Sequence, residues 1–222
     1  MNLVQRVQDI LLKPKATWPV IDAEQDDTAA LYKNYVMILA LIPAVASFIG
    51  LSVIGIGAFG VNFRVPIVSG LANMVVGYVL SLVMVFVLAL IVDAMAPTFE
   101  GTKSQIGALK VAAYSSSAAF VGGVFSLLPS LSVLGALVAL YGIYLLYTGL
   151  PALMKCPQDK AIAYTAVVVV CAIVGGFVIA WVLALLTPSP GRIGAASSSS
   201  NVPSLDLGKI EAMQQRTPTA KS

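Results

Sequence analysis

Histidine is absent from this chain of 222 residues, cysteine occurs only twice, and 10% of the residues are charged. Without histidine the sequence lacks the usual general base and the commonest metal ligand, and two cysteines are too few for a cysteine-rich zinc site. A formal net charge of +3 is too small for a nucleic-acid-binding face. We therefore expect no metal, no cofactor and no nucleic acid, and we do not expect an enzyme.

Apolar sequence is what the chain has in excess: 59% of its residues are hydrophobic and its mean hydropathy is +0.93. A soluble domain carries about 25% charged residues, so an integral membrane protein is expected. A transmembrane helix needs about 20 largely apolar residues. Five segments meet this requirement, namely 35–57, 71–96, 106–128, 131–154 and 162–186. The predicted fold is all-α, a bundle of five transmembrane helices.

The third of these segments, 106–128, is the most polar, because it contains Lys110 and three consecutive serines. A four-helix alternative, in which this segment is re-entrant or peripheral, stays open. Small residues at four-residue spacing (Ala108, Ala112, Ser116) would let neighbouring helices approach this segment closely. The pattern favours a compact bundle with the third helix at its centre and a packing role for the serines.

The distribution of lysine and arginine predicts the orientation, because cytoplasmic loops carry an excess of these residues. They concentrate before the first span and in the second and fourth connections, whereas the first connection carries only Arg64 and the third carries none. The N-terminus and the second and fourth connections are therefore predicted to be cytoplasmic. With five spans, the C-terminus would lie on the periplasmic or external side.

Residues 1–34 form the predicted cytoplasmic segment. Apolar residues from Leu3 to Leu11 recur at helical spacing, and Pro14 ends the pattern. Such an amphipathic helix is predicted to lie in the membrane interface, with Trp18 as an anchor at headgroup depth. The alternative is an ordinary helix packed against the cytoplasmic ends of the bundle.

Composition changes after the last span. Residues 187–222 contain several prolines and glycines and four consecutive serines. Such a segment cannot build a core, so we expect a disordered tail. The predicted organisation is a cytoplasmic segment (1–34), a transmembrane domain (35–186) and this tail.

Two charged residues fall inside predicted spans, Asp93 near the end of the second and Lys110 near the start of the third. In a helical hairpin folded about Gly101 and Thr102 they lie at about the same depth. An unpaired charge deep in lipid costs about 2.5–3.5 kcal/mol, so each is expected to have a partner or to face a wet cavity, and at this depth the two could pair. The pair is either a structural clamp between helices or part of the pathway of a small transporter or channel.

Three stretches share an order and spacing with a known family: DAMAPTF at 93–99, KVAAYSS at 110–116, and YLLYTGLPALMK at 144–155, which runs on through Pro157, Asp159 and Lys160. They resemble the bacterial branch of the Ypt-interacting protein (Yip) domain family, and the resemblance covers residues 1–186. One departure is Glu100 beside Gly101, where a second glycine is expected.

The resemblance implies a five-helix membrane domain with a cytoplasmic N-terminus. Eukaryotic members bind prenylated Rab-type GTPases and help shape or traffic vesicles, and the bacterial branch has no clear assigned activity. We expect a non-enzymatic protein of the bacterial cytoplasmic (inner) membrane that organises partners or lipids. The bilayer, membrane or cytoplasmic proteins and a second copy of the chain are its candidate partners. The expected cytoplasmic interaction surface consists of Pro97, Phe99, Lys155, Pro157, Asp159 and Lys160.

Overall fold

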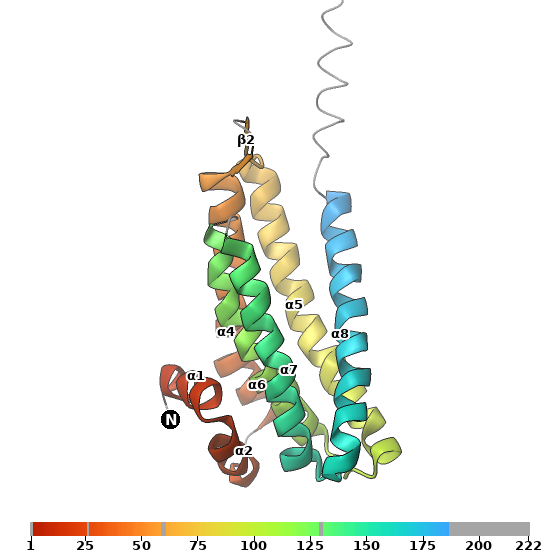
Figure 1. Ribbon diagram of the computed structural model, residues 1–222. Coiled ribbons are helices and arrows are strands. Elements are labelled where there is room, and N and C mark those ends of the chain that lie inside the picture. Colours follow the sequence, from red (N-terminus) through yellow and green to blue (C-terminus); the bar gives the residue numbers. More distant parts are fainter. Residues whose placement is uncertain (1, 26, 59–60, 129–130, 187–222) are drawn as a thin grey trace, which may run out of the picture. The chain divides into compact units, whose positions relative to one another are not determined.

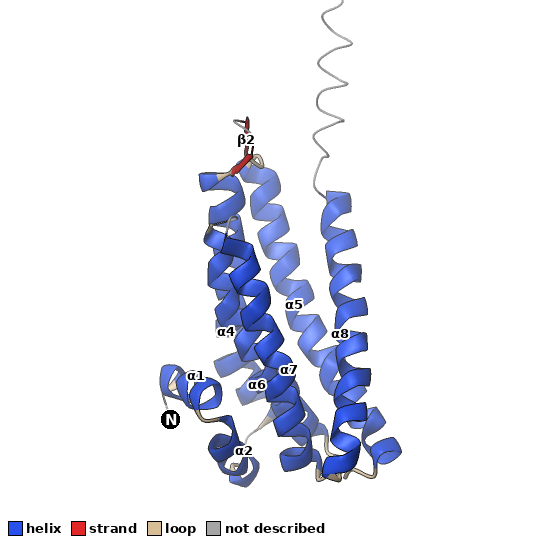
Figure 2. Cartoon of the chain, in the orientation of Figure 1, coloured by secondary structure: helices blue, strands red, loops and turns tan. Residues whose placement is uncertain are grey.

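The computed structural model describes residues 2–25, 27–58, 61–128 and 131–186, and it is almost entirely helical (Figures 1 and 2). Five helical segments are long and apolar enough to cross a membrane: Thr28–Ile54, Ile67–Phe99, Gln105–Leu127, Val133–Met154 and Gln158–Leu185. The predicted helical fold with five spans is confirmed. The tail expected at 187–222 lies outside the described residues.

The first span is built from four consecutive pieces: α3 (Thr28–Leu31), the π-helical η1 (Tyr32–Val36), α4 (Met37–Phe48) and the π-helical η2 (Ile49–Ile54). It ends at Gly55, whose φ of 85° lies in a region that only glycine adopts readily. The helix therefore stops earlier than the apolar run predicted. An antiparallel hairpin of β1 (Ile56–Ala58) and β2 (Val61–Phe63) follows.

The remaining spans are continuous helices, two of which end in a 3-10 turn. They are α5 (Ile67–Met95) with η3 (Ala96–Phe99), α6 (Gln105–Gly122) with η4 (Gly123–Leu127), α7 (Ser132–Met154) and α8 (Gln158–Leu186). Ser104 caps α6, because its hydroxyl accepts a hydrogen bond from the Gly107 N–H at 3.2 Å.

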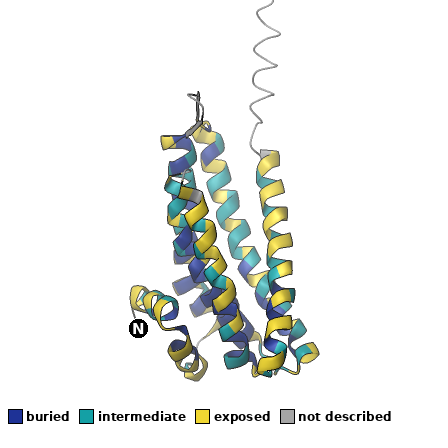
Figure 3. Cartoon of the chain, viewed as in Figure 1, coloured by how far each residue is buried: buried dark blue, intermediate teal, exposed yellow. Residues whose placement is uncertain are grey.

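Helix α6 lies at the centre of the bundle, where it packs against α4, α5 and α7. Most of its residues are buried, and Figure 3 shows the buried positions concentrated where the helices meet. Its Ser117 hydroxyl lies 2.7 Å from the hydroxyl of Tyr35, so a serine in this span is bonded within the protein. The least apolar span is tolerated because helices rather than lipid surround it, and the prediction of a central third helix is confirmed.

Candidate functional site

Two short helices before the first span, α1 (Leu3–Leu12) and α2 (Pro14–Ala23), form what we call the N-terminal cap (Figure 1). The cap packs against α6 and α7. Ile10, Trp18 and Ile21 are each at most 1% exposed, because they insert into the core of the bundle. The apolar face of the cap therefore contacts protein, as in the alternative of a helix packed against the ends of the spans.

Trp18 shows why the cap docks. Its indole lies against Gly149 of α7, where a Cβ atom would come within 2.6 Å of Cζ2 of the ring. Its Nε1 donates a hydrogen bond to Thr148 Oγ1 at 3.0 Å, and its ring meets Tyr114 edge-on with centroids 6.3 Å apart. The expected role of Trp18 as a headgroup anchor is thus corrected: the missing side chain of Gly149 leaves room for the ring inside the protein.

Polar contacts tie the cap to the spans as well. Tyr141 of α7 donates its hydroxyl hydrogen to the Leu11 carbonyl at 2.8 Å. Lys155, just after α7, pairs with Asp22 at 2.5 Å. Within the cap region, Arg6 pairs with Glu24. The first two contacts join separate points of the cap to α7 and to the residue that follows it, and so help fix how the cap lies on the bundle.

Lys110 of α6 is almost fully buried beneath the cap. Its ammonium group donates to the carbonyl oxygens of Ile21, at 2.8 Å, and of Glu24, at 2.5 Å. These carbonyls belong to the end of α2, where backbone acceptors have no partner within the helix and a cation is favoured. Lys110 therefore supplies hydrogen-bond donors to the C-terminal end of α2 and stabilises it.

Asp93 lies on a different contact, in the last turns of α5 beside Tyr164 of α8. It is only 5% exposed, and its Oδ1 has no hydrogen-bond partner among the described residues. No hydrogen bond or ion pair joins Asp93 to Lys110 in the described part of the chain. The expected pair is therefore corrected, since Lys110 is directed to the end of α2.

The connections after α5 and after α7 do come together. The Thr102 N–H donates to the Met154 carbonyl at 2.6 Å, and Phe99 stacks on Tyr164 with ring centroids 4.8 Å apart. Lys160, in the first turn of α8, pairs with Glu100 in the connection after α5. The remaining residues of the predicted surface lie on the same two connections or at the start of α8, with Pro97, Lys155 and Asp159 exposed and Pro157 half-buried.

Glu100 stands where the family resemblance predicts a second glycine, and it adopts a backbone conformation that glycine favours. Its φ is 57°, in the left-handed region that favours glycine. The side chain of this strained residue pairs with Lys160. The negative charge is therefore matched locally by a lysine in the first turn of α8.

Cys156 lies between α7 and α8, outside the spans, and its side chain is buried. Burial raises the pKa of the thiol above its ordinary value of 9.0, and the nearby Asp159 carboxylate raises this pKa further. The thiol is therefore protonated at neutral pH. A protonated thiol is a poor nucleophile, so this position does not favour covalent chemistry.

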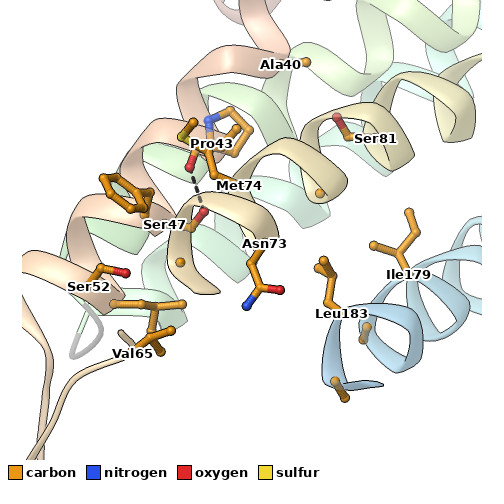
Figure 4. Close-up of a pocket in the computed structure, with 17 residues that line it drawn as sticks. Ala40, Pro43, Ser47, Ser52, Val65, Asn73, Met74, Ser81, Ile179 and Leu183 are labelled. Carbon is orange, nitrogen blue, oxygen red and sulfur yellow. Dashed lines mark hydrogen bonds between the residues drawn. The ribbon is translucent and has the colours of Figure 1, made fainter. Parts of the chain in front are cut away.

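Two larger cavities lie between the spans, and no charged side chain lines either of them in the described part of the chain. One, of about 420 Å³, lies between α4, α5 and α8 (Figure 4). There the Ser47 and Ser81 hydroxyls donate to carbonyls of their own helices, Ala44 at 3.0 Å and Tyr78 at 2.7 Å. Ser52 and Asn73 are the other polar side chains of this lining, which is otherwise apolar.

The other cavity, of about 590 Å³, lies between α5, α6, α7 and α8. Ala112 and Ser116 belong to the small-residue pattern that was expected to bring helices together, and here they line open space. Helix α8 packs against α5 as well as against α7. As a result, α7 and α8 leave space beside this part of α6.

Residues 9–186 match the Yip1 domain family. The chain is 25% identical over 167 residues to the inner membrane protein YohC of Escherichia coli strain K12. The aligned region covers 73% of this chain and 86% of that protein. The protein of the same name from E. coli O6:H1 strain CFT073 gives the same values. No solved structure matches.

Proposed function

The chain belongs to the Yip1 domain family of integral membrane proteins, and we propose that it is a non-enzymatic organiser of partners or lipids in the bacterial inner membrane. Its working surface is the end of the bundle that carries the N-terminal cap. The inner-membrane relative from E. coli supports the location. The concentration of lysine and arginine near this end supports a cytoplasmic N-terminus and an external C-terminus.

The observation that carries this proposal is the docked cap. Its inner face is used up in packing on α6 and α7, yet Val4 and Leu12 remain 58% and 76% exposed on α1, outside the spans. Large apolar side chains held on a fixed surface favour contact with a protein or a bilayer. The connections that carry Pro97 and Lys155 adjoin the same end and complete the proposed surface.

A non-enzymatic role is supported by the same residues that would have to do chemistry. Histidine is absent from the sequence, and the Cys156 thiol is protonated. Asp93 is the only acidic residue in the sequence between Asp27 and Glu100. An intramembrane aspartyl protease needs two carboxylates acting together.

In-cell photo-crosslinking tests the proposal. A probe at Leu12, and another at Thr102, should capture a protein that can be identified and that captures this chain in the reverse experiment. A probe at Ile173, an exposed position in the middle of α8, is the matched control and should capture lipid only. If neither position of the cap end captures a protein or a lipid that the control does not, this surface is not the working surface.

A small transporter or channel is the second candidate, and one observation favours it. A buried carboxylate with an oxygen that has no hydrogen-bond partner among the described residues is typical of an ion or proton site within a span. Asp93→Asn should then abolish flux in reconstituted vesicles while the protein still folds. Unchanged flux would remove Asp93 from any transport pathway.

A further inference from the structure

A groove of about 320 Å³ lies between the N-terminal cap and the end of α7. Its walls include Lys15 and Trp18 from α2, Tyr147, Thr148 and Pro151 from α7, and Gln158, the first residue of α8. We propose that this groove binds the phosphate-bearing headgroup of an anionic phospholipid, from the leaflet that adjoins the cap. The proposal deepens the proposed function, on which it rests for the placement of the cap at a membrane surface.

Polarity within the groove is divided between an apolar back and a cationic mouth. At the back, the only polar atom of the indole is already bonded to Thr148, as described above. At the mouth lie the exposed side chains of Lys15 and Gln158. The described lining thus contains one cation and no carboxylate, and the acidic residue next in the chain, Asp159, is not part of it. Such a lining suits an anion attached to an apolar body.

Lys15 differs from three other lysines near this end of the bundle, Lys110, Lys155 and Lys160. Lys155 and Lys160 each pair with a carboxylate of this chain, and Lys110 binds the end of α2. Lys15 makes no hydrogen bond or ion pair within the described part of the chain. The protein therefore provides a cation in a groove without providing its anion.

Depth identifies the source of the anion. Tyr147 and Pro151 precede the last residue of α7 by seven and three positions, which is roughly 10 Å and 5 Å along a helix. The headgroup layer on each side of a bilayer is about 5–8 Å thick. With the end of α7 at the outer edge of the headgroup layer, the groove extends from the headgroups into the first part of the hydrocarbon, where a phospholipid places both its phosphate and its first acyl carbons. A soluble phosphate compound would leave the apolar half of the groove empty.

Native mass spectrometry of the full chain tests this inference, with equal amounts of phosphatidylglycerol and phosphatidylethanolamine offered in mild detergent. The wild type should retain phosphatidylglycerol in preference, by about fivefold for one basic side chain near the lipid. Lys15→Gln should lose that preference. Lys13→Gln is the matched control, because it makes the same charge change two positions away at an exposed residue outside the groove.

Three other outcomes overturn the inference. An equal loss of preference in Lys13→Gln and Lys15→Gln would mean diffuse electrostatic attraction rather than a site. Displacement of the lipid by millimolar inorganic phosphate would assign the groove to a soluble anion. A wild type without any preference would remove the site, and if Leu12 still captured an identified protein, the proposed function would stand. If the wild type prefers phosphatidylglycerol but the probes at Leu12 and Thr102 capture no protein, lipid binding in this groove is the only activity of the end of the bundle that carries the N-terminal cap.

Discussion

The contact between Trp18 and Gly149 allows the cost of a single methyl group to be worked out. A Cβ at Gly149 would lie 2.6 Å from Cζ2 of the indole and 2.9 Å from two further ring atoms. The ring cannot move aside freely, because it is buried and its Nε1 is bonded to Thr148. Overpacking of this kind costs about 1–3 kcal/mol.

The same substitution also has a favourable term, because alanine is better than glycine in a helix interior by about 1 kcal/mol. Gly176 supplies the control, since it lies in α8 and a Cβ there would meet nothing within 4 Å. Gly176→Ala should therefore raise the free energy of unfolding by about 1 kcal/mol. Gly149→Ala should fall below Gly176→Ala by about 1–3 kcal/mol, the overpacking term alone.

Tryptophan fluorescence and denaturant unfolding in mixed micelles measure both effects. The chain has two tryptophans, and Trp181 is 65% exposed on α8, so a Trp181→Phe background leaves Trp18 as the only reporter. In Gly149→Ala, the emission of Trp18 should shift to the red and become more accessible to acrylamide. If Gly149→Ala and Gly176→Ala were equally stabilised, with Trp18 equally protected, the docking of the cap on α7 would be wrong.

Three further predictions concern the same end of the bundle. Lys110→Met should lower the free energy of unfolding by about 1.5–3 kcal/mol and expose the end of α2 to proteolysis. Undiminished protease resistance would show that Lys110 does not stabilise the end of α2. Glu100→Gly should leave stability unchanged or raise it by up to about 1 kcal/mol, because relief of the left-handed strain offsets a weak exposed ion pair with Lys160; a clear destabilisation in thermal unfolding would show that the pair matters more. The raised pKa of the Cys156 thiol favours the protonated folded state below the ordinary value of 9.0, and this stabilisation is lost as pH rises through the higher folded pKa. Maleimide should thus label Cys156 more slowly at pH 8 in the folded than in the unfolded chain, and equal rates would contradict its burial.

The spans could be predicted from the sequence because lipid imposes a simple requirement of length and apolarity. The central position of α6 was also predictable, since small residues and serines are tolerated where helices surround a helix. The starts of the first, second and fifth spans were placed four to seven residues too late, and the end of the first span was placed three residues too late. Gly55 and the hairpin follow an apolar run without any change in hydropathy, so composition does not show where the helix stops.

The partner of Lys110 could not be predicted, for a geometric reason. Folding a hairpin about its midpoint fixes the depth of two residues, but not the side of the helix to which each points. At 3.6 residues per turn, Asp93 and Lys110 can share a depth and still face different neighbours. The acceptors that Lys110 binds are backbone carbonyls, which every residue carries, so no sequence pattern marks them.

The environment of Trp18 could not be decided from the sequence, because one amphipathic pattern fits two different environments. An apolar face with a tryptophan at its edge suits a lipid interface as well as a protein surface. The deciding residue is Gly149, more than a hundred positions away, whose lack of a side chain becomes meaningful only when the indole is seen against it. The pair Thr148 and Gly149, a hydroxyl acceptor beside a gap on one helix, is the signal that a search for a tryptophan site could have used.

The burial of Trp18 and the Lys155–Asp22 ion pair contribute unequally to holding the N-terminal cap. The Lys155–Asp22 pair is largely exposed and contributes at most about 1 kcal/mol. Burial of an aromatic side chain such as Trp18 is worth several times more, since truncation to alanine costs about 3–5 kcal/mol. The pair therefore cannot hold the cap in place, and the packing of Trp18 against α7 is what positions α2. The same packing brings Lys15, three positions before Trp18 on α2, to the mouth of the groove.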